Sequence, residues 1–140
     1  MANTILVPID FHIESLDAVR EALILNNNHS TKVVLMYSEY LSDSITELLF
    51  YSPEKVLQKH ITPEFTEALE IIKNRFEGSV TDISIKVFHG VNPNAMAIFC
   101  DANGIDSVYI PAKYKLKTPK RAFNPISLLK KAAIPITEVH

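Results

Sequence analysis

The chain has 140 residues, enough for one ordinary domain, which buries roughly two thirds of the surface that its unfolded form exposes. Its composition, 47% apolar and 21% charged, excludes a disordered or collagen-like chain. A net charge of −2 gives no overall attraction to nucleic acids or anionic membranes, and the single cysteine excludes an intramolecular disulfide and a cysteine-based metal cluster. The opening apolar run has no basic leader and is too short for a signal peptide or a membrane span. We therefore expect one cytoplasmic domain over residues 1–140, with no nucleic-acid and no membrane partner.

The first third of the chain predicts a strand, a helix and a second strand. Residues 4–9 (TILVPI) and 32–37 (KVVLMY) are the nearly continuous apolar runs of strands that are covered on both faces. Between them, apolar residues recur at helical spacing over residues 14–26. A strand, helix and strand in this order predict a parallel sheet.

The segment 38–61 is less regular and predicts two short helices. Ser44 and Glu47 have the spacing of a capping box. Ser52 before Pro53 fits an N-cap residue followed by a proline at the first helical position. Whether this segment is a dimer-contact arm or a lid is left open by its residues.

Three further helices are predicted, each opened by a polar N-cap residue and a proline. These pairs are Thr62-Pro63, Asn92-Pro93 and Asn124-Pro125. The first two of these helices are expected to end at Gly78 and Gly104, because glycine readily adopts the left-handed conformation that follows a helix.

Three strands complete the chain, over residues 83–88, 107–111 and 134–139. Polar residues alternate with apolar ones in 83–88, which predicts a strand that is less fully covered than the first two and lies at a sheet edge. Pro135 cannot donate a backbone hydrogen bond, so the last strand also suits an edge.

This order of elements, which opens with ILVPIDF and closes with a helix followed by IPITEV, resembles the universal stress protein family over essentially the whole chain. The resemblance implies an α/β fold with a doubly wound five-stranded parallel sheet, strand order 3-2-1-4-5 and helices on both faces. A ligand would lie where the first and fourth strands diverge, at a crevice marked by Asp10 and by Pro111 and Ala112.

Nucleotide-binding members of the family carry the pattern Gly-x2-Gly-x9-Gly after the fourth strand, followed by Ser or Thr. Residues 111–123 (PAKYKLKTPKRAF) contain no glycine, and Ala122 and Phe123 stand where the last glycine and its hydroxyl neighbour would be. A Cβ at each position obstructs the close backbone approach that a phosphate cradle needs. We therefore expect no bound cofactor, with ATP or another adenine nucleotide as the alternative.

Five residues are candidates for binding a ligand: Asp10, Tyr37, Ala112, Lys113 and Asn124. Asp10 matches the aspartate that the family places near the adenosine, but an aspartate after a strand is equally often a helix-entry cap. Tyr37 could stack on a base or fill the space where the family has a small residue. The other three border the crevice and the basic segment after it.

Five cations lie between residues 113 and 121, just before the N-terminus of a helix, where free backbone N–H groups favour anions. They are Lys113, Lys115, Lys117, Lys120 and Arg121. The segment is either a substitute phosphate site or a solvated loop. His12 lies near Asp10 and could act as an acid or base, but no nucleophile motif accompanies it.

The leading hypothesis is a non-catalytic stress-response or regulatory protein, not an enzyme, that forms a homodimer through its C-terminal strand and could have a further protein partner. The alternative is a nucleotide- or polyanion-binding switch, with weak ATPase activity, that uses the basic loop 113–121. An enzyme of the adenine-nucleotide alpha-hydrolase type would need a glycine- or serine-rich phosphate loop after the first strand, which the sequence lacks.

Overall fold

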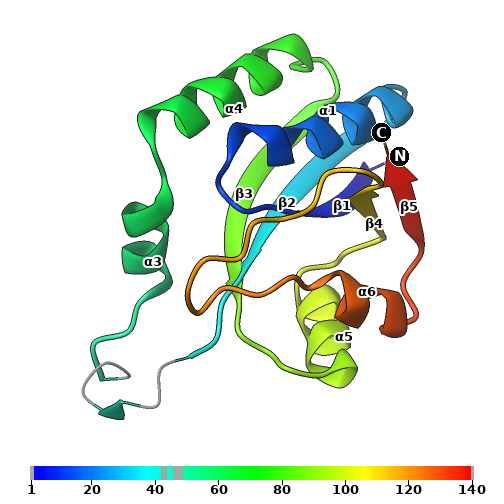
Figure 1. Cartoon of the computed structure of the whole chain (residues 1–140). Helices are drawn as coiled ribbons and strands as arrows, with labels where there is room; N and C mark the ends of the chain where they lie inside the picture. The colour runs from blue at the N-terminus through cyan, green and yellow to red at the C-terminus, as the bar shows by residue number, and fades with distance from the viewer. Residues whose placement is uncertain (1, 42–43, 46–48, 140) are drawn as a thin grey trace.

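The computed structural model describes residues 2–41, 44–45 and 49–139 (Figure 1). Five parallel strands form one sheet in the order β3-β2-β1-β4-β5. In chain order the elements are β1 (Ala2–Pro8), the 3-10 helix η1 (Ile13–Leu16), α1 (Asp17–Leu25), β2 (Ser30–Ser38), α3 (Pro53–His60), α4 (Pro63–Arg75), β3 (Val80–Phe88), α5 (Pro93–Ala102), β4 (Ser107–Pro111), α6 (Ile126–Lys131) and β5 (Ile136–Val139). The doubly wound α/β fold and its predicted strand order are confirmed.

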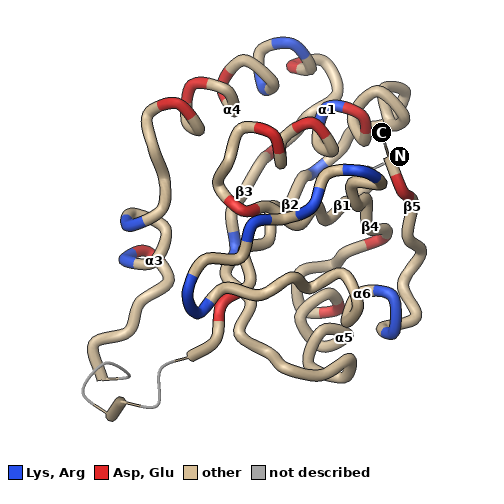
Figure 2. The backbone as a smooth tube through the Cα atoms, in the orientation of Figure 1, with Lys and Arg blue, Asp and Glu red and all other residues tan. Residues whose placement is uncertain are grey.

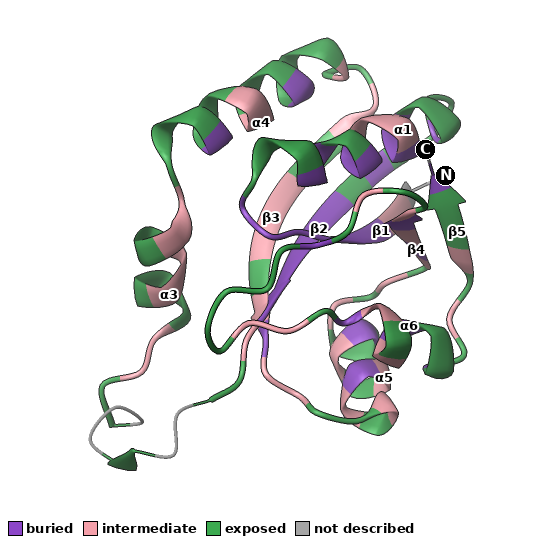
Figure 3. Cartoon of the chain, viewed as in Figure 1, coloured by how far each residue is buried: buried purple, intermediate pink, exposed green. Residues whose placement is uncertain are grey.

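Two layers of helices cover the sheet, and successive residues of the central strands supply their two cores. Ile5 and Val33 pack against η1, α1 and α4, whereas Leu6 and Val34 pack against α5 and α6. Since both faces of β1 and β2 are buried (Figure 3), their nearly continuous apolar sequences are explained.

Both predicted edge strands lie at the edges, with β3 at one end of the sheet and β5 at the other. The last strand begins at Ile136, two residues later than expected. Pro135 precedes it, and the Pro135 carbonyl accepts a hydrogen bond from the Val108 N–H at 2.8 Å. The proline therefore adds to the ladder with its acceptor although it has no donor.

Three of the predicted N-caps are present as expected. The side chains of Ser52, Thr62 and Asn92 each accept a hydrogen bond from the backbone N–H three residues later, at 3.1, 3.1 and 2.8 Å. The predicted capping box from Ser44 includes Glu47, which lies outside the described residues.

Three boundaries differ from the sequence-based expectation. The segment 14–26 is divided into η1 and α1. α4 ends at Arg75, and of the two predicted terminal glycines only Gly104 has a positive φ, 64°, so the role assigned to Gly78 was wrong. α6 begins at Ile126 rather than Pro125, because Pro125 takes up a turn conformation in which the Asn124 side chain accepts from the Ile126 N–H at 3.0 Å.

Candidate functional site

The turn after β1 places Asp10 at the carboxyl edge of the sheet. The Ile9 N–H continues the ladder to the Met36 carbonyl at 2.9 Å, and the chain then reverses at Phe11, whose φ is 65°. Asp10 Oδ1 accepts from the His12 N–H at 3.0 Å, which makes Asp10 the cap of the turn that leads into η1. Of the two roles considered for Asp10, the one that this hydrogen bond shows is the cap.

The second carboxylate oxygen of Asp10 is held by the loop that follows β4. Asp10 Oδ2 accepts from the Tyr114 hydroxyl and, at 2.8 Å, from the Lys117 N–H. The Asp10 residue is only 6% exposed. Burial and the hydrogen bond to Asp10 raise the pKa of Tyr114, so its hydroxyl stays protonated as the donor. The chain itself therefore supplies three donors to this carboxylate.

The same loop, residues 112–123, crosses the carboxyl edge of the sheet and joins the end of β2 (Figure 1). The Tyr40 N–H donates to the Arg121 carbonyl at 2.7 Å, and the Phe123 N–H donates to the Ser38 carbonyl at 3.1 Å. Ala122 thus pairs with an extension of β2 at the place where the family resemblance put a phosphate cradle. Sequence reasoning missed this path because it depends on partners more than 80 residues apart.

Tyr37 fills space in the core beside this turn. Its ring is 2% exposed and lies 4.8 Å from the Phe11 ring and 4.9 Å from the His60 ring, measured between centroids. Burial, followed by the charges of Glu39 and Asp10, raises the pKa of Tyr37 to about 12. Phe11 also stacks on His60 and contacts Phe65, so aromatic rings occupy the space beside the carboxyl ends of β1 and β2.

Of the five candidate ligand residues, the structure brings two together. Asp10 and Tyr37 line one cavity of about 350 Å³, which we call the Asp10 cavity. Lys113 lines a different cavity beside α1. The Ala112 N–H donates to the Val139 carbonyl at 2.7 Å in continuation of the sheet, and Asn124 forms the turn before α6.

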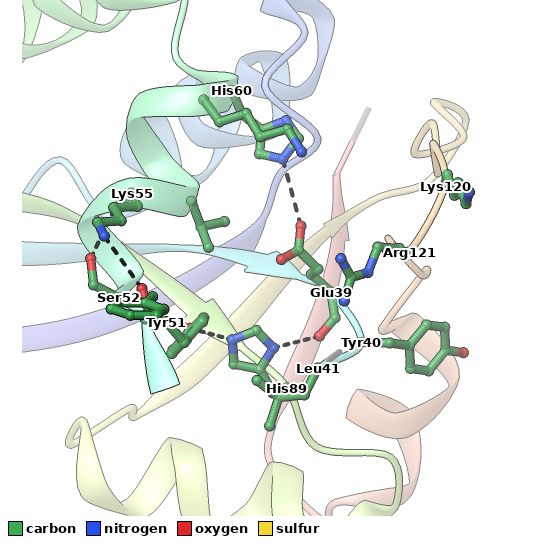
Figure 4. Close-up of a pocket in the computed structure, with 13 residues that line it drawn as sticks. Glu39, Tyr40, Leu41, Tyr51, Ser52, Lys55, His60, His89, Lys120 and Arg121 are labelled. Carbon is green, nitrogen blue, oxygen red and sulfur yellow. Dashed lines mark hydrogen bonds and ion pairs between the residues drawn. The ribbon is translucent and has the colours of Figure 1, made fainter. Parts of the chain in front are cut away.

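A further cavity, of about 230 Å³, lies between α3 and the loop that follows β4 (Figure 4); we call it the α3 pocket. Its lining residues are Glu39, Tyr40, Leu41, Phe50, Tyr51, Ser52, Lys55, Val56, Lys59, His60, His89, Lys120 and Arg121. Of these residues, only the two loop cations were considered for binding a ligand from the sequence, because four separate segments contribute the lining.

Hydrogen bonds fix the floor of the α3 pocket. His89 Nδ1 lies 2.7 Å from the Glu39 carbonyl oxygen, which only accepts, so Nδ1 carries a proton, and His89 Nε2 faces the Tyr51 hydroxyl. The Glu39 carboxylate lies 3.6 Å from His60 Nε2. Burial, with the charges of Glu39 and Glu54, raises the pKa of Tyr51, which keeps this hydroxyl a donor near neutral pH.

Positive charge gathers on the two walls of the α3 pocket. Figure 2 shows basic residues along the loop after β4 and on the facing α3 helix.

Among the residues that the structure describes, no group of three or more His, Cys, Asp or Glu side chains is placed to hold a metal ion. In that same part of the chain, no helix has both the length and the apolar character needed to cross a bilayer.

The sheet, its two helical layers and the crevice at its carboxyl edge define a doubly wound α/β domain. No family model matches the sequence, and no curated protein matches it significantly. Solved structures do match. The universal stress protein UspA from Lactobacillus plantarum superposes with a TM-score of 0.62 at 14% identity, over 99% of this chain and 97% of that one. A universal stress protein from Archaeoglobus fulgidus gives 0.58 at 17% identity, over 99% and 93%.

A third match is a universal stress protein family protein from Arabidopsis thaliana, solved with AMP bound. It gives a TM-score of 0.51 at 13% identity, over 98% of this chain and 90% of that one. The chain therefore has the fold of the universal stress proteins.

Proposed function

We propose that this chain is a non-catalytic regulatory protein of the universal stress type, in which the loop after β4 occupies the Asp10 carboxylate. We call this state the closed crevice; the Asp10 cavity of about 350 Å³ lies beside it. The observation that carries the proposal is the hydrogen bonding of both Asp10 carboxylate oxygens by the chain itself, Oδ1 by the His12 N–H and Oδ2 by the Tyr114 hydroxyl and the Lys117 N–H. The Arabidopsis protein was solved with AMP bound, which makes adenine nucleotides the ligands to test here.

A ribose hydroxyl that takes the place of Tyr114 and Lys117 at Asp10 Oδ2 requires the loop to release that oxygen. Hydrogen bonds to a charged group contribute about 1.5–3 kcal/mol each, so releasing both loop donors costs about 3 kcal/mol or more. An opening cost of about 3 kcal/mol weakens binding roughly a hundredfold. The absence of glycine from residues 111–123 adds to this penalty, because the backbone cannot surround a phosphate in the usual way.

The side chains around Asp10 support a role without catalysis. The Ser15 hydroxyl, the nearest candidate nucleophile in the turn, donates to the His12 carbonyl at 2.8 Å and has no imidazole as its base. Cys100 is buried on the other side of the sheet, and burial raises its pKa to about 11, which suppresses the reactive thiolate.

Calorimetric titration tests the proposal. ATP, AMP and cyclic AMP are each added to the wild-type protein and to Tyr114→Phe, which removes one loop donor from Asp10. Tyr109→Phe is the matched control, because the Tyr109 hydroxyl accepts from the Asn26 side chain at the end of α1 and not from the loop after β4. We expect no saturable heat with the wild type or the control. A dissociation constant for wild type tighter than about 100 µM, equivalent to roughly 5.5 kcal/mol of binding, would refute the closed crevice.

The second candidate function is a nucleotide- or polyanion-binding switch with weak ATPase activity. The observation that favours it is the meeting of Lys120 and Arg121 with the α3 lysines around one cavity. The test is phosphate release from ATP by the wild-type protein and by Lys120→Gln. The switch requires that the wild type releases phosphate and that the variant does so more slowly.

A homodimer through β5 is part of the proposal. β5 is an edge strand, and a second copy paired along it would cover backbone groups that the sheet leaves open. Sedimentation at micromolar concentration should give a dimer, and Glu138→Pro, which removes an N–H that points to the open edge and not to β4, should shift it toward monomer. A monomer at all concentrations would exclude the dimer.

A further inference from the structure

The α3 pocket is a second site, separate from the Asp10 cavity. Among the described residues that line the two cavities, only His60 is shared. The α3 pocket has one wall from α3, one from the end of the loop after β4, and a floor from Glu39 and His89, as Figure 4 shows. The contacts of the loop with Asp10 therefore leave this pocket open.

Charge in the α3 pocket favours an anion. Among the residues that the structure describes, Lys55, Lys59, Lys120 and Arg121 line it, together with one carboxylate, that of Glu39. The Glu39 carboxylate already faces His60 at 3.6 Å, and over residues 2–41, 44–45 and 49–139 neither Lys59 nor Lys120 forms an ion pair. Two cations on opposite walls thus remain available to a ligand, and a doubly charged group satisfies both better than a singly charged one.

Aromatic surface in the same pocket favours a ring. Tyr40, Phe50 and Tyr51 line it, and the Phe50 and Tyr40 residues are 68% and 48% exposed. Tyr40 is held by stacking on Phe123 with 4.6 Å between ring centroids, and Tyr51 is held by its hydrogen bond to His89. Because partners already fix two of these rings, a flat ligand loses little by ordering them.

The size of the α3 pocket limits the ligand. A volume of about 230 Å³ lies below the roughly 300–1,000 Å³ of pockets that enclose drug-sized ligands, so the α3 pocket suits a smaller molecule. One six-membered ring joined to one phosphate is such a molecule. We propose that the α3 pocket binds a small molecule that joins one aromatic ring to one phosphate group. The site does not depend on the proposed function, since it is formed whether the Asp10 cavity holds a nucleotide or not.

Phenyl phosphate is the probe, titrated at low salt by calorimetry and by proton NMR of the histidine rings. His89 lines only the α3 pocket and His12 lines only the Asp10 cavity, so the two signals report the two sites separately. We expect saturable binding with a submillimolar dissociation constant, a shifted His89 signal and an unshifted His12 signal. Inorganic phosphate, benzoate and phenol, which each lack one part of the probe, should bind at least about fivefold more weakly, as expected when about 1 kcal/mol of contact is lost.

Two variants that each remove one positive charge distinguish binding in the α3 pocket from general attraction to the basic loop. Lys59→Gln should weaken binding of phenyl phosphate about threefold to tenfold, the effect of one charged contact of about 1 kcal/mol. Lys113→Gln, which changes an exposed lysine in the cavity beside α1, should alter it less than twofold. Three results would overturn the proposal: no saturation, equal weakening by both variants, or inorganic phosphate that binds as tightly as the probe. A shift of His12 alone would place the ligand in the Asp10 cavity and contradict the closed crevice as well.

Discussion

Replacing Asp10 with Asn should loosen the loop after β4 without changing the size of the side chain. Asp10 accepts from the His12 N–H with one oxygen and from Tyr114 and the Lys117 N–H with the other. Asparagine keeps one acceptor oxygen and replaces the other with an NH₂ donor. The Tyr114 hydroxyl can rotate to accept from that NH₂, but a backbone N–H cannot, so His12 or Lys117 loses its partner whichever way the amide is turned.

The cost follows from these contacts. An unsatisfied buried N–H costs about 1–3 kcal/mol, and the remaining hydrogen bonds lose their charge assistance, so we expect the free energy of unfolding to fall by about 2–3 kcal/mol. For a domain of this size the midpoint of thermal unfolding should drop by about 6–12 °C. Urea unfolding followed by circular dichroism measures the first quantity. Trypsin cleavage within residues 113–121 measures loop opening and should become about tenfold faster, a change of about 1.4 kcal/mol.

Asp101→Asn on the exposed face of α5 is the matched control and should change the free energy of unfolding by less than about 0.5 kcal/mol. If Asp10→Asn behaves like this control and the loop is cleaved no faster, then Asp10 does not hold the loop, and the closed-crevice reasoning fails.

Three further predictions follow from burial. The pKa of Tyr37 is raised to about 12 and that of Tyr114 is raised above its ordinary 10.0, so both hydroxyls stay protonated in the folded protein at a pH where they ionise in the unfolded chain. The stability that these two groups contribute is complete below pH 10 and is lost as the pH rises through their folded pKa values. Ultraviolet absorbance should show at least these two of the five tyrosines ionising at higher pH than a free tyrosine. Cys100, with its pKa raised to about 11, should react with a disulfide reagent only on unfolding; rapid reaction of the native protein would contradict its burial. Leu35→Ala in the core should cost about 3–5 kcal/mol in urea unfolding and Leu49→Ala, which is 76% exposed, under about 0.5 kcal/mol; similar costs would contradict this core.

The fold was predictable because its main signals are local and mutually consistent. The apolar runs at 4–9 and 32–37 could be satisfied only by strands covered on both faces, and the structure buries them between the two helical layers. Three of four proline-linked caps were right for the same reason, since a cap needs only the next three residues. Asn124 failed because the following proline formed a turn, a choice that the dipeptide alone does not determine.

The candidate site was predictable only in part. Asp10 and Tyr37 were selected and do share one cavity, since both follow from the position of strand ends in a doubly wound sheet. Tyr114 and Lys117 donate hydrogen bonds to the Asp10 carboxylate but lie 104 and 107 residues after Asp10 in the chain, so no local sequence pattern connects them with it. The α3 pocket was missed for the same reason, because Glu39, Lys59, His89 and Arg121 meet only in three dimensions.

The loop after β4 also bears on how the sheet holds together. β1 and β4 share only two registered pairs, Ile5 with Ser107 and Leu6 with Val108, fewer than at any other junction between strands of this sheet. This junction is the seam between two halves, β3-β2-β1 and β4-β5. The loop leaves one half and is bonded to the other at Asp10 and again at Tyr40, so it acts as a brace across the seam. Release of Asp10 by the loop therefore also removes one of the two attachments that cross this seam.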